Sequence, residues 1–228
     1  MIRPQAPLLV LALVLTACEV IVQLAAPMVF VSEISLDPLQ IPRAPLPPAE
    51  REGGKVVLVI PADVRKAAVA VRFESGMRTV IVRVGAVVDQ AARTSLEGVL
   101  RDGLWPGDPP AASPGADAIV RIEAVRLAYR ERRLSVEWKA GELIQTYESR
   151  ATLAFDVKVS DAGGRLVQSR TYEDGDGRLL WTIPSEASAP EVKWLESHLH
   201  ETAGRLAQQA AADLHRWLRT ERLKPRSL

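Results

Sequence analysis

The sequence feature that most limits the fold and the location of this chain is a short apolar segment near its N-terminus, which ends at the only cysteine. Arg3 supplies a single positive charge, residues 8–15 are almost purely aliphatic, and the small residue Ala17 precedes Cys18. This is the layout of a cleavable secretory signal. The apolar run is too short to cross a hydrocarbon core, which needs about 20 apolar residues. The chain has no second cysteine that could pair with Cys18. The fold must therefore be held by a hydrophobic core, without an internal disulfide.

The junction Leu15-Thr16-Ala17-Cys18 resembles the lipobox of bacterial lipoproteins. The resemblance implies that Cys18 receives a diacylglycerol on its sulfur, becomes the first mature residue, and is then acylated on its new amino group by a chain such as palmitate. Two or more acyl chains hold a protein stably at a bilayer, at about 0.8 kcal/mol per buried methylene. We therefore expect a chain that is anchored to a membrane and does not span it.

An uncleaved anchor is the alternative, because residues 20–31 are again mostly apolar. Glu19, Gln23 and Pro27 interrupt that continuation, and a charge near the centre of a membrane helix costs about 2.5–3.5 kcal/mol. The lipidated form is favoured. In enterobacterial lipoproteins an Asp after the modified cysteine usually means inner-membrane retention, so Glu19 favours the outer membrane, on its periplasmic face.

The sequence divides into a signal peptide (1–17), a lipidated N-terminus with a Pro-rich tether (18–54) and one folded domain (55–228). Five prolines between residues 37 and 50 favour an extended spacer, with a loop lying on the domain as the alternative. The apolar stretch 20–31 could add an edge strand, dock on the domain or contact a partner. After residue 17 the chain carries 28 basic and 28 acidic side chains, a balance that does not indicate nucleic-acid binding.

The apolar patterns predict an α+β domain, in which a mixed, mainly antiparallel sheet has two helices packed on one face. Strands are typical of residues 56–60, 68–73, 77–84, 120–129, 134–138, 151–160 and 165–172, and helices of residues 87 to about 102 and 191 to about 221. The first strand should be central and buried on both faces. A change in alternation predicts a bulge near Ala124. Turns are expected at 130–133, at Ala140-Gly141 and at 161–164, and a turn-rich segment at 173–190.

Few side chains are arranged for catalysis or for metal binding. His198 and His200 are two apart on one predicted helix and point about 200° away from each other, and His215 lies far beyond them. Neither a Gly-x-Ser-x-Gly elbow nor a Walker loop is present in the sequence. Residues 173–177, Glu-Asp-Gly-Asp-Gly, could wrap a calcium ion, but they lack the later bidentate Glu and favour a solvated acidic turn. We expect no cofactor, no metal and no enzymatic activity.

Two tryptophans are candidates for partner contacts. Trp105 and Trp181 stand in proline-containing stretches that are typical of loops, and exposed tryptophans are favoured anchors at interfaces. The alternative is that both side chains fold back as lids over the sheet.

The layout is similar to small periplasmic lipoproteins of envelope assembly and transport, such as YajG-type lipoproteins, auxiliary lipoproteins of ABC transporters, and the N-terminal domains of CsgG and TolB. Beyond the lipobox, the resemblance rests on a strand, a helix near 87–100, the Ala-Asp opening in Gly115-Ala116-Asp117-Ala118, antiparallel strands and a C-terminal helix. It implies a non-enzymatic accessory or assembly subunit of an envelope complex, with envelope proteins as partners. A carrier that binds a lipid or another apolar ligand between sheet and helices is the alternative, and an enzyme is the third.

Overall fold

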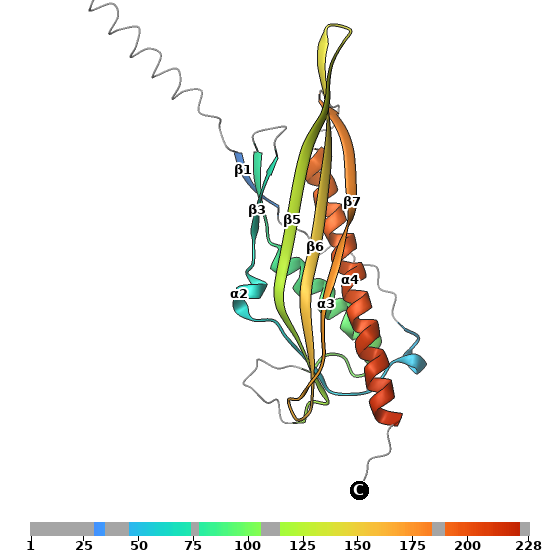
Figure 1. Cartoon of the computed structure of the whole chain (residues 1–228). Helices are drawn as coiled ribbons and strands as arrows, with labels where there is room; N and C mark the ends of the chain where they lie inside the picture. The colour runs from blue at the N-terminus through green and yellow to red at the C-terminus, as the bar shows by residue number, and fades with distance from the viewer. Residues whose placement is uncertain (1–29, 35–45, 74–77, 106–114, 184–189, 224–228) are drawn as a thin grey trace, which may run out of the picture.

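The computed structural model describes residues 30–34, 46–73, 78–105, 115–183 and 190–223, and these form the α+β fold of Figure 1. Residues 1–29, which include the predicted signal and Cys18, lie outside the described residues, as does most of the Pro-rich segment. The end of that segment lies against the domain. Leu46 packs on the core, and His215 Nε2 is 2.9 Å from the carbonyl oxygen of Glu50 in the 3-10 helix η1 (Pro48–Glu50).

The larger sheet has four strands in the order β2-β5-β6-β7. They are β2 (Val56–Val59), β5 (Ala118–Lys139), β6 (Glu142–Asp161) and β7 (Leu166–Ile183). Only β2 pairs in parallel, with β5, so the predicted mixed and mainly antiparallel pairing is confirmed. Although β2 is fully buried as expected, it occupies an edge of the sheet and not its centre.

The smaller sheet has the order β1-β4-β3. The predicted hairpin is confirmed as β3 (Val69–Phe73) paired antiparallel with β4 (Arg78–Val82). The edge strand β1 (Phe30–Ile34) pairs in parallel with β4, so the last two residues of the apolar stretch 20–31 belong to an edge strand. The strands therefore divide between two sheets, where the sequence analysis expected one.

The helices α3 (Val84–Val99) and α4 (Pro190–Leu223) pack on one face of the larger sheet, as predicted (Figure 1). Leu195, Leu199, Leu206 and Leu214 of α4 are at most 2% exposed. They meet alternate residues of β6 such as Phe155 in one hydrophobic core. Apolar residues that recur every three or four positions in the helix thus pack against apolar residues at every second position of the strand.

Helix α3 begins three residues earlier than predicted and contains Gly85, which directly follows the strand predicted at 77–84. The amide of Gly85 donates to the carbonyl oxygen of Ala67 at 3.0 Å. A Cβ on Gly85 would collide with the backbone carbonyls of Val64 and Arg65, at the end of the short helix α2 (Ala62–Arg65). This glycine therefore allows two backbones to approach closely and does not mark the end of a strand.

Two predicted turns are wrong. Residues 130–133 lie inside β5, which continues to Lys139, because their charged side chains find cross-strand partners such as Glu148. Residues 173–183 belong to β7, and only 184–189 of the predicted turn-rich segment lie outside the described residues. Within this part of β7, Asp174 forms an ion pair with Arg205 of α4, and Gly177 leaves room for the His198 ring.

Two local predictions are confirmed. The register of β5 and β6 shifts between Ile122 and Ala124, where the alternation of apolar residues changes. The turn at Ala140 and Gly141 joins β5 to β6, and both residues have positive φ, 50° and 84°.

Candidate interaction surfaces

The hairpin of β5 and β6 extends beyond the rest of the larger sheet, as Figure 1 shows. The last residue of β7, Ile183, pairs with Gln145. Residues 136–144 therefore form a two-stranded ribbon, closed by the turn at Ala140 and Gly141, with no third strand beside it among the described residues. We call this segment the ribbon. A two-stranded ribbon by itself is marginally stable in water.

One face of the ribbon carries large apolar side chains that are exposed. Trp138 is 73% exposed and pairs directly with Leu143, which is 39% exposed, and Val136 on the same face is 50% exposed. This face continues the helix-covered face of the sheet, since Tyr147 of β6 has the same parity as Leu143. Contiguous exposed apolar residues mark interaction sites. The sequence analysis placed Trp138 in a strand but did not single it out.

Trp181 is 8% exposed and lies in β7, so it is not the loop-borne anchor that we expected. Its ring stacks on Tyr147 with centroids 5.0 Å apart, and its Nε1 donates to Ser149 Oγ at 3.1 Å. The alternative, a side chain folded back over the sheet, describes it correctly. Trp181 therefore packs inside the domain, against the part of β6 that leads into the ribbon, which we call the base of the ribbon.

A buried hydrogen-bond cluster completes that base. Tyr129 donates its hydroxyl to Ser149 Oγ at 3.0 Å, and Ser149 lies 3.4 Å from Glu131 Oε1. Burial, the largest effect, raises the pKa of Tyr129, so its hydroxyl stays protonated and donating. Ser149 is 0% exposed, and its buried hydroxyl finds its hydrogen-bond partners within the cluster. The cluster fixes the three strands together where the ribbon begins.

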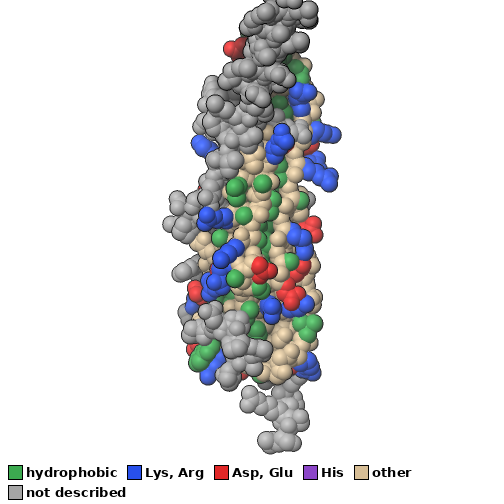
Figure 2. All heavy atoms as spheres, turned by 90° about the vertical axis from the view of Figure 1, so that its left-hand side faces the viewer, with side chains coloured by type: hydrophobic (Ala, Val, Ile, Leu, Met, Phe, Trp, Pro, Cys, Tyr) green, Lys and Arg blue, Asp and Glu red, His purple; other side chains and the backbone are tan. Residues whose placement is uncertain are grey.

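The opposite face of the same strands is rich in arginine. Arg130, Arg150 and Arg178 are aligned across β5, β6 and β7. Glu148, which is buried, forms ion pairs with two of them, Arg150 at 3.0 Å and Arg178 at 2.6 Å. The hydrogen bond from Arg150, followed by the nearby arginine charges, lowers the pKa of Glu148 against the opposing effect of burial. Lys and Arg side chains are also prominent toward the upper end of the side shown in Figure 2.

Trp105 lies at the other end of the molecule. Its amide donates to the carbonyl oxygen of Val56 at 2.8 Å, and Val56 pairs with Ala118 at the start of β5, the end farthest from the ribbon. The ring is 45% exposed, with Lys55 Nζ 4.4 Å from its centroid. The predicted contact residues are therefore not brought together: Trp105 is exposed at one end, and Trp181 is buried near the other.

The three histidines lie apart on α4. His198 stacks on Trp194 with centroids 5.2 Å apart, His200 is half-buried, and His215 faces η1. Desolvation lowers the pKa of His200. Within the described residues there is no group of three or more His, Cys, Asp or Glu side chains that could hold a metal ion.

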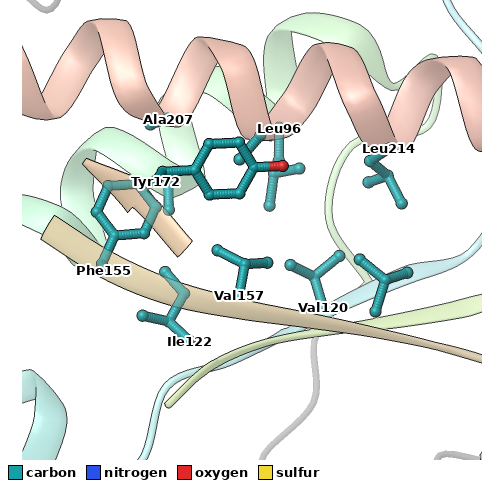
Figure 3. A pocket seen from close by; sticks show the side chains of 11 residues that line it. Leu96, Val120, Ile122, Phe155, Val157, Tyr172, Ala207 and Leu214 are labelled. Carbon is teal, nitrogen blue, oxygen red and sulfur yellow. The ribbon is translucent and has the colours of Figure 1, made fainter. Parts of the chain in front are cut away.

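A small apolar cavity lies between the sheet and helices α3 and α4 (Figure 3). Leu96, Ile122, Phe155, Val157 and Leu214 are among its lining residues, and Tyr172 adds the hydroxyl that Figure 3 shows. That hydroxyl donates to Asp213 Oδ2 at 2.9 Å. The cavity has a volume of about 10 Å³, room for about one water molecule, whereas pockets for small-molecule ligands usually hold roughly 300–1,000 Å³.

No helix in the described part of the chain has the length and the apolarity needed to cross a membrane. No protein-family model matches the sequence, and no curated protein matches it.

Several solved structures align with most of the chain at low identity. A minor lipoprotein from Acinetobacter baumannii is 14% identical, with 72% of this chain and 93% of that chain covered and a TM-score of 0.33. Rare lipoprotein B from Shewanella oneidensis is 15% identical, with 72% and 98% covered and a TM-score of 0.38. An uncharacterized lipoprotein B from Nitrosomonas europaea is 15% identical, with 75% and 91% covered and a TM-score of 0.39. All three are described as lipoproteins, but similarities this weak assign no function to this chain.

Proposed function

We propose that this protein is a lipoprotein, held through Cys18 on the periplasmic face of the outer membrane, that serves as a non-enzymatic accessory or assembly subunit of an envelope complex. The lipobox at residues 15–18 supports the anchor. The observation that carries the accessory role is that exposed tryptophans stand at opposite ends of one long sheet, Trp138 in the ribbon and Trp105 beside the start of β5. A protein built in this way presents one end to the membrane and the other to a partner.

Trp105 is the residue we propose for the protein contact. Exposed tryptophans contribute strongly to binding when a partner desolvates them, and Lys55 and the Val56 carbonyl hold this one in place. The carrier function has less support, because the cavity between sheet and helices holds about 10 Å³. A lipid chain would enter only if α3 and α4 moved away from the sheet.

Co-purification from membranes tests the accessory role. The protein is expressed at its native level, cross-linked in intact cells, extracted with detergent and purified as wild type, as Trp105→Ala and as Leu166→Ala. Leu166 is the matched control, because it is 53% exposed and begins β7 at the same end of the sheet.

We expect a stoichiometric protein partner with the wild type and with Leu166→Ala, and loss of most of it with Trp105→Ala. Repeated recovery of the wild type without any stoichiometric partner contradicts the accessory role. Equal recovery with all three proteins contradicts the assignment of Trp105 alone.

A further inference from the structure

We propose that the ribbon is a second membrane contact: Trp138, Leu143 and Val136 insert into the interface of the same leaflet that holds the acyl chains on Cys18. The inference rests on the proposed lipid anchor and adds the site and the partner, a phospholipid surface. The anchor alone leaves the domain free to turn, whereas two contacts fix its orientation.

The first described strand, β1, begins at its ribbon-facing end. Phe30, the first residue of β1, pairs with Arg78, which in turn pairs with Phe73 at the end of β3. The Phe73 ring meets Tyr129 of β5 edge-on, with centroids 5.1 Å apart. Because β1 runs from this level away from the ribbon, Phe30 stands at the end of β1 that is nearer the ribbon (Figure 1).

The available lengths match. Phe30 lies twelve positions after Cys18, and a chain of twelve residue steps spans at most roughly 40 Å. Lys139, beside the turn, lies ten positions after Tyr129 in β5, which is roughly 34 Å of antiparallel strand. An extended connection therefore allows the lipid on Cys18 and the end of the ribbon to reach one membrane plane.

The ribbon has side chains that are typical of segments at a membrane–water interface. Tryptophan concentrates at the level of lipid headgroups, where one part of the ring is apolar and its N–H meets water. Val136 and Leu143 extend the apolar surface beside Trp138, while Glu137 and Lys139 on the opposite face form an ion pair at 3.1 Å. From Val136 to the turn the ribbon is roughly 13 Å long, close to the 5–10 Å that interfacial segments bury.

An introduced thiol tests this contact, because lipid consumes the only native cysteine. Ala140→Cys places a thiol at the turn of the ribbon, and Leu166→Cys places one at the far end of the sheet. Each full-length lipidated protein is labelled with an environment-sensitive fluorophore. It is then reconstituted on vesicles of phosphatidylethanolamine and phosphatidylglycerol, with and without brominated acyl chains.

We expect the label at residue 140 to shift to the blue and to lose most of its emission in brominated lipid, while the label at residue 166 keeps a water-like spectrum. Adding Trp138→Ser to Ala140→Cys should abolish the shift and the quenching without releasing the protein from vesicles. Leu180→Ser, at another exposed leucine of β7 (55%), should change neither.

The remaining outcomes each overturn the inference. Protein that floats with vesicles while the label at residue 140 stays water-like retains the anchor and has no ribbon contact. A blue shift without quenching by brominated lipid, rising with protein concentration, assigns the ribbon to a second copy of this chain. Protein that does not float with vesicles contradicts the lipid anchor, and therefore also the ribbon contact that depends on it.

Discussion

At the scale of single residues, Gly85 shows how one missing methyl group sets the packing of two helices. It lies in the first turn of α3, against the carbonyls of Val64 and Arg65. Backbone atoms cannot rotate away as the end of a flexible side chain can. The position therefore tolerates no Cβ unless α2 and α3 separate.

Gly85→Ala should destabilise the protein by about 1–3 kcal/mol, the usual cost of overpacking. The sign is informative, since alanine in place of glycine inside a helix is otherwise stabilising by up to about 1 kcal/mol. Urea unfolding followed by circular dichroism measures the change. Gly163→Ala is the control, because its Cβ would lie 3.4 Å from Asp161 Oδ1, an ordinary contact. A Gly85→Ala protein as stable as the wild type contradicts the close approach.

Asp156 illustrates an electrostatic contribution at the same scale. Arg126 donates to both carboxylate oxygens, at 2.7 and 2.8 Å, and Thr171 donates to Oδ1 at 2.7 Å. The hydrogen bonds from Arg126 and then Thr171 lower the pKa of Asp156 from 3.8 to about 2. Because the folded pKa is the lower one, this contribution is present above the unfolded pKa and is lost as pH falls toward the folded value.

Asp156→Asn should therefore destabilise the protein at neutral pH, and the difference from wild type should shrink as pH falls from about 5 to about 2. Urea midpoints across that range measure it. Asp102→Asn, at an exposed carboxylate after α3, is the matched control for the loss of one carboxylate. A difference that stays constant down to the lowest pH contradicts the assigned ion pair.

At the scale of elements, the long strands carry both the core and the exposed surface. The strand at 151–160 could be predicted because the odd-numbered residues are all apolar, and each of them is buried. Residues 130–133 and 173–183 could not, because runs of charge and of Gly with Asp are also typical of turns. In this fold the charges pair across strands, and Gly177 accommodates the His198 ring. Partners so distant in sequence leave no local pattern.

The ribbon escaped prediction for a related reason. Its exposure depends on β7 ending at Ile183, opposite Gln145, while β5 and β6 continue. Relative strand lengths follow from pairing and not from local sequence. The turn at Ala140-Gly141 was nevertheless predicted, and the proximity of Trp138 to that turn is the signal that could have identified an exposed aromatic residue.

The two predicted contact tryptophans should differ in their effect on stability. Trp181→Ala removes the stack on Tyr147 and the donor to Ser149, and should cost about 3–5 kcal/mol. Trp105→Ala should cost about 1 kcal/mol or less, since an exposed cation–π contact is worth roughly 0.5–1 kcal/mol. Thermal and urea unfolding compare them, and Trp181→Phe, which keeps a ring, should fall between. Equal losses for Trp105→Ala and Trp181→Ala contradict the burial difference.

At the scale of the whole molecule, function follows from how the ends of the sheet differ. One end carries the ribbon, and Phe30, the first residue of β1, faces that end. The other end carries Trp105 and the starts of β2 and β5. The sequence predicted the anchor and the helix-covered sheet, whereas the separation of the ends became visible only with the strand register. In the proposed function, the ribbon end faces the membrane and the Trp105 end holds a partner at a set distance from it.

The proposed function and the ribbon contact both require a lipid at Cys18, and mass spectrometry of the mature N-terminus detects that lipid. The protein is purified from membranes and digested, and its N-terminal peptide is sequenced by fragmentation. We predict a chain that starts at Cys18 and carries a diacylglycerol on the sulfur and an acyl chain on the amino group. A chain that starts at Met1, or a mature peptide with an unmodified Cys18, contradicts the anchor and the membrane orientation derived from it.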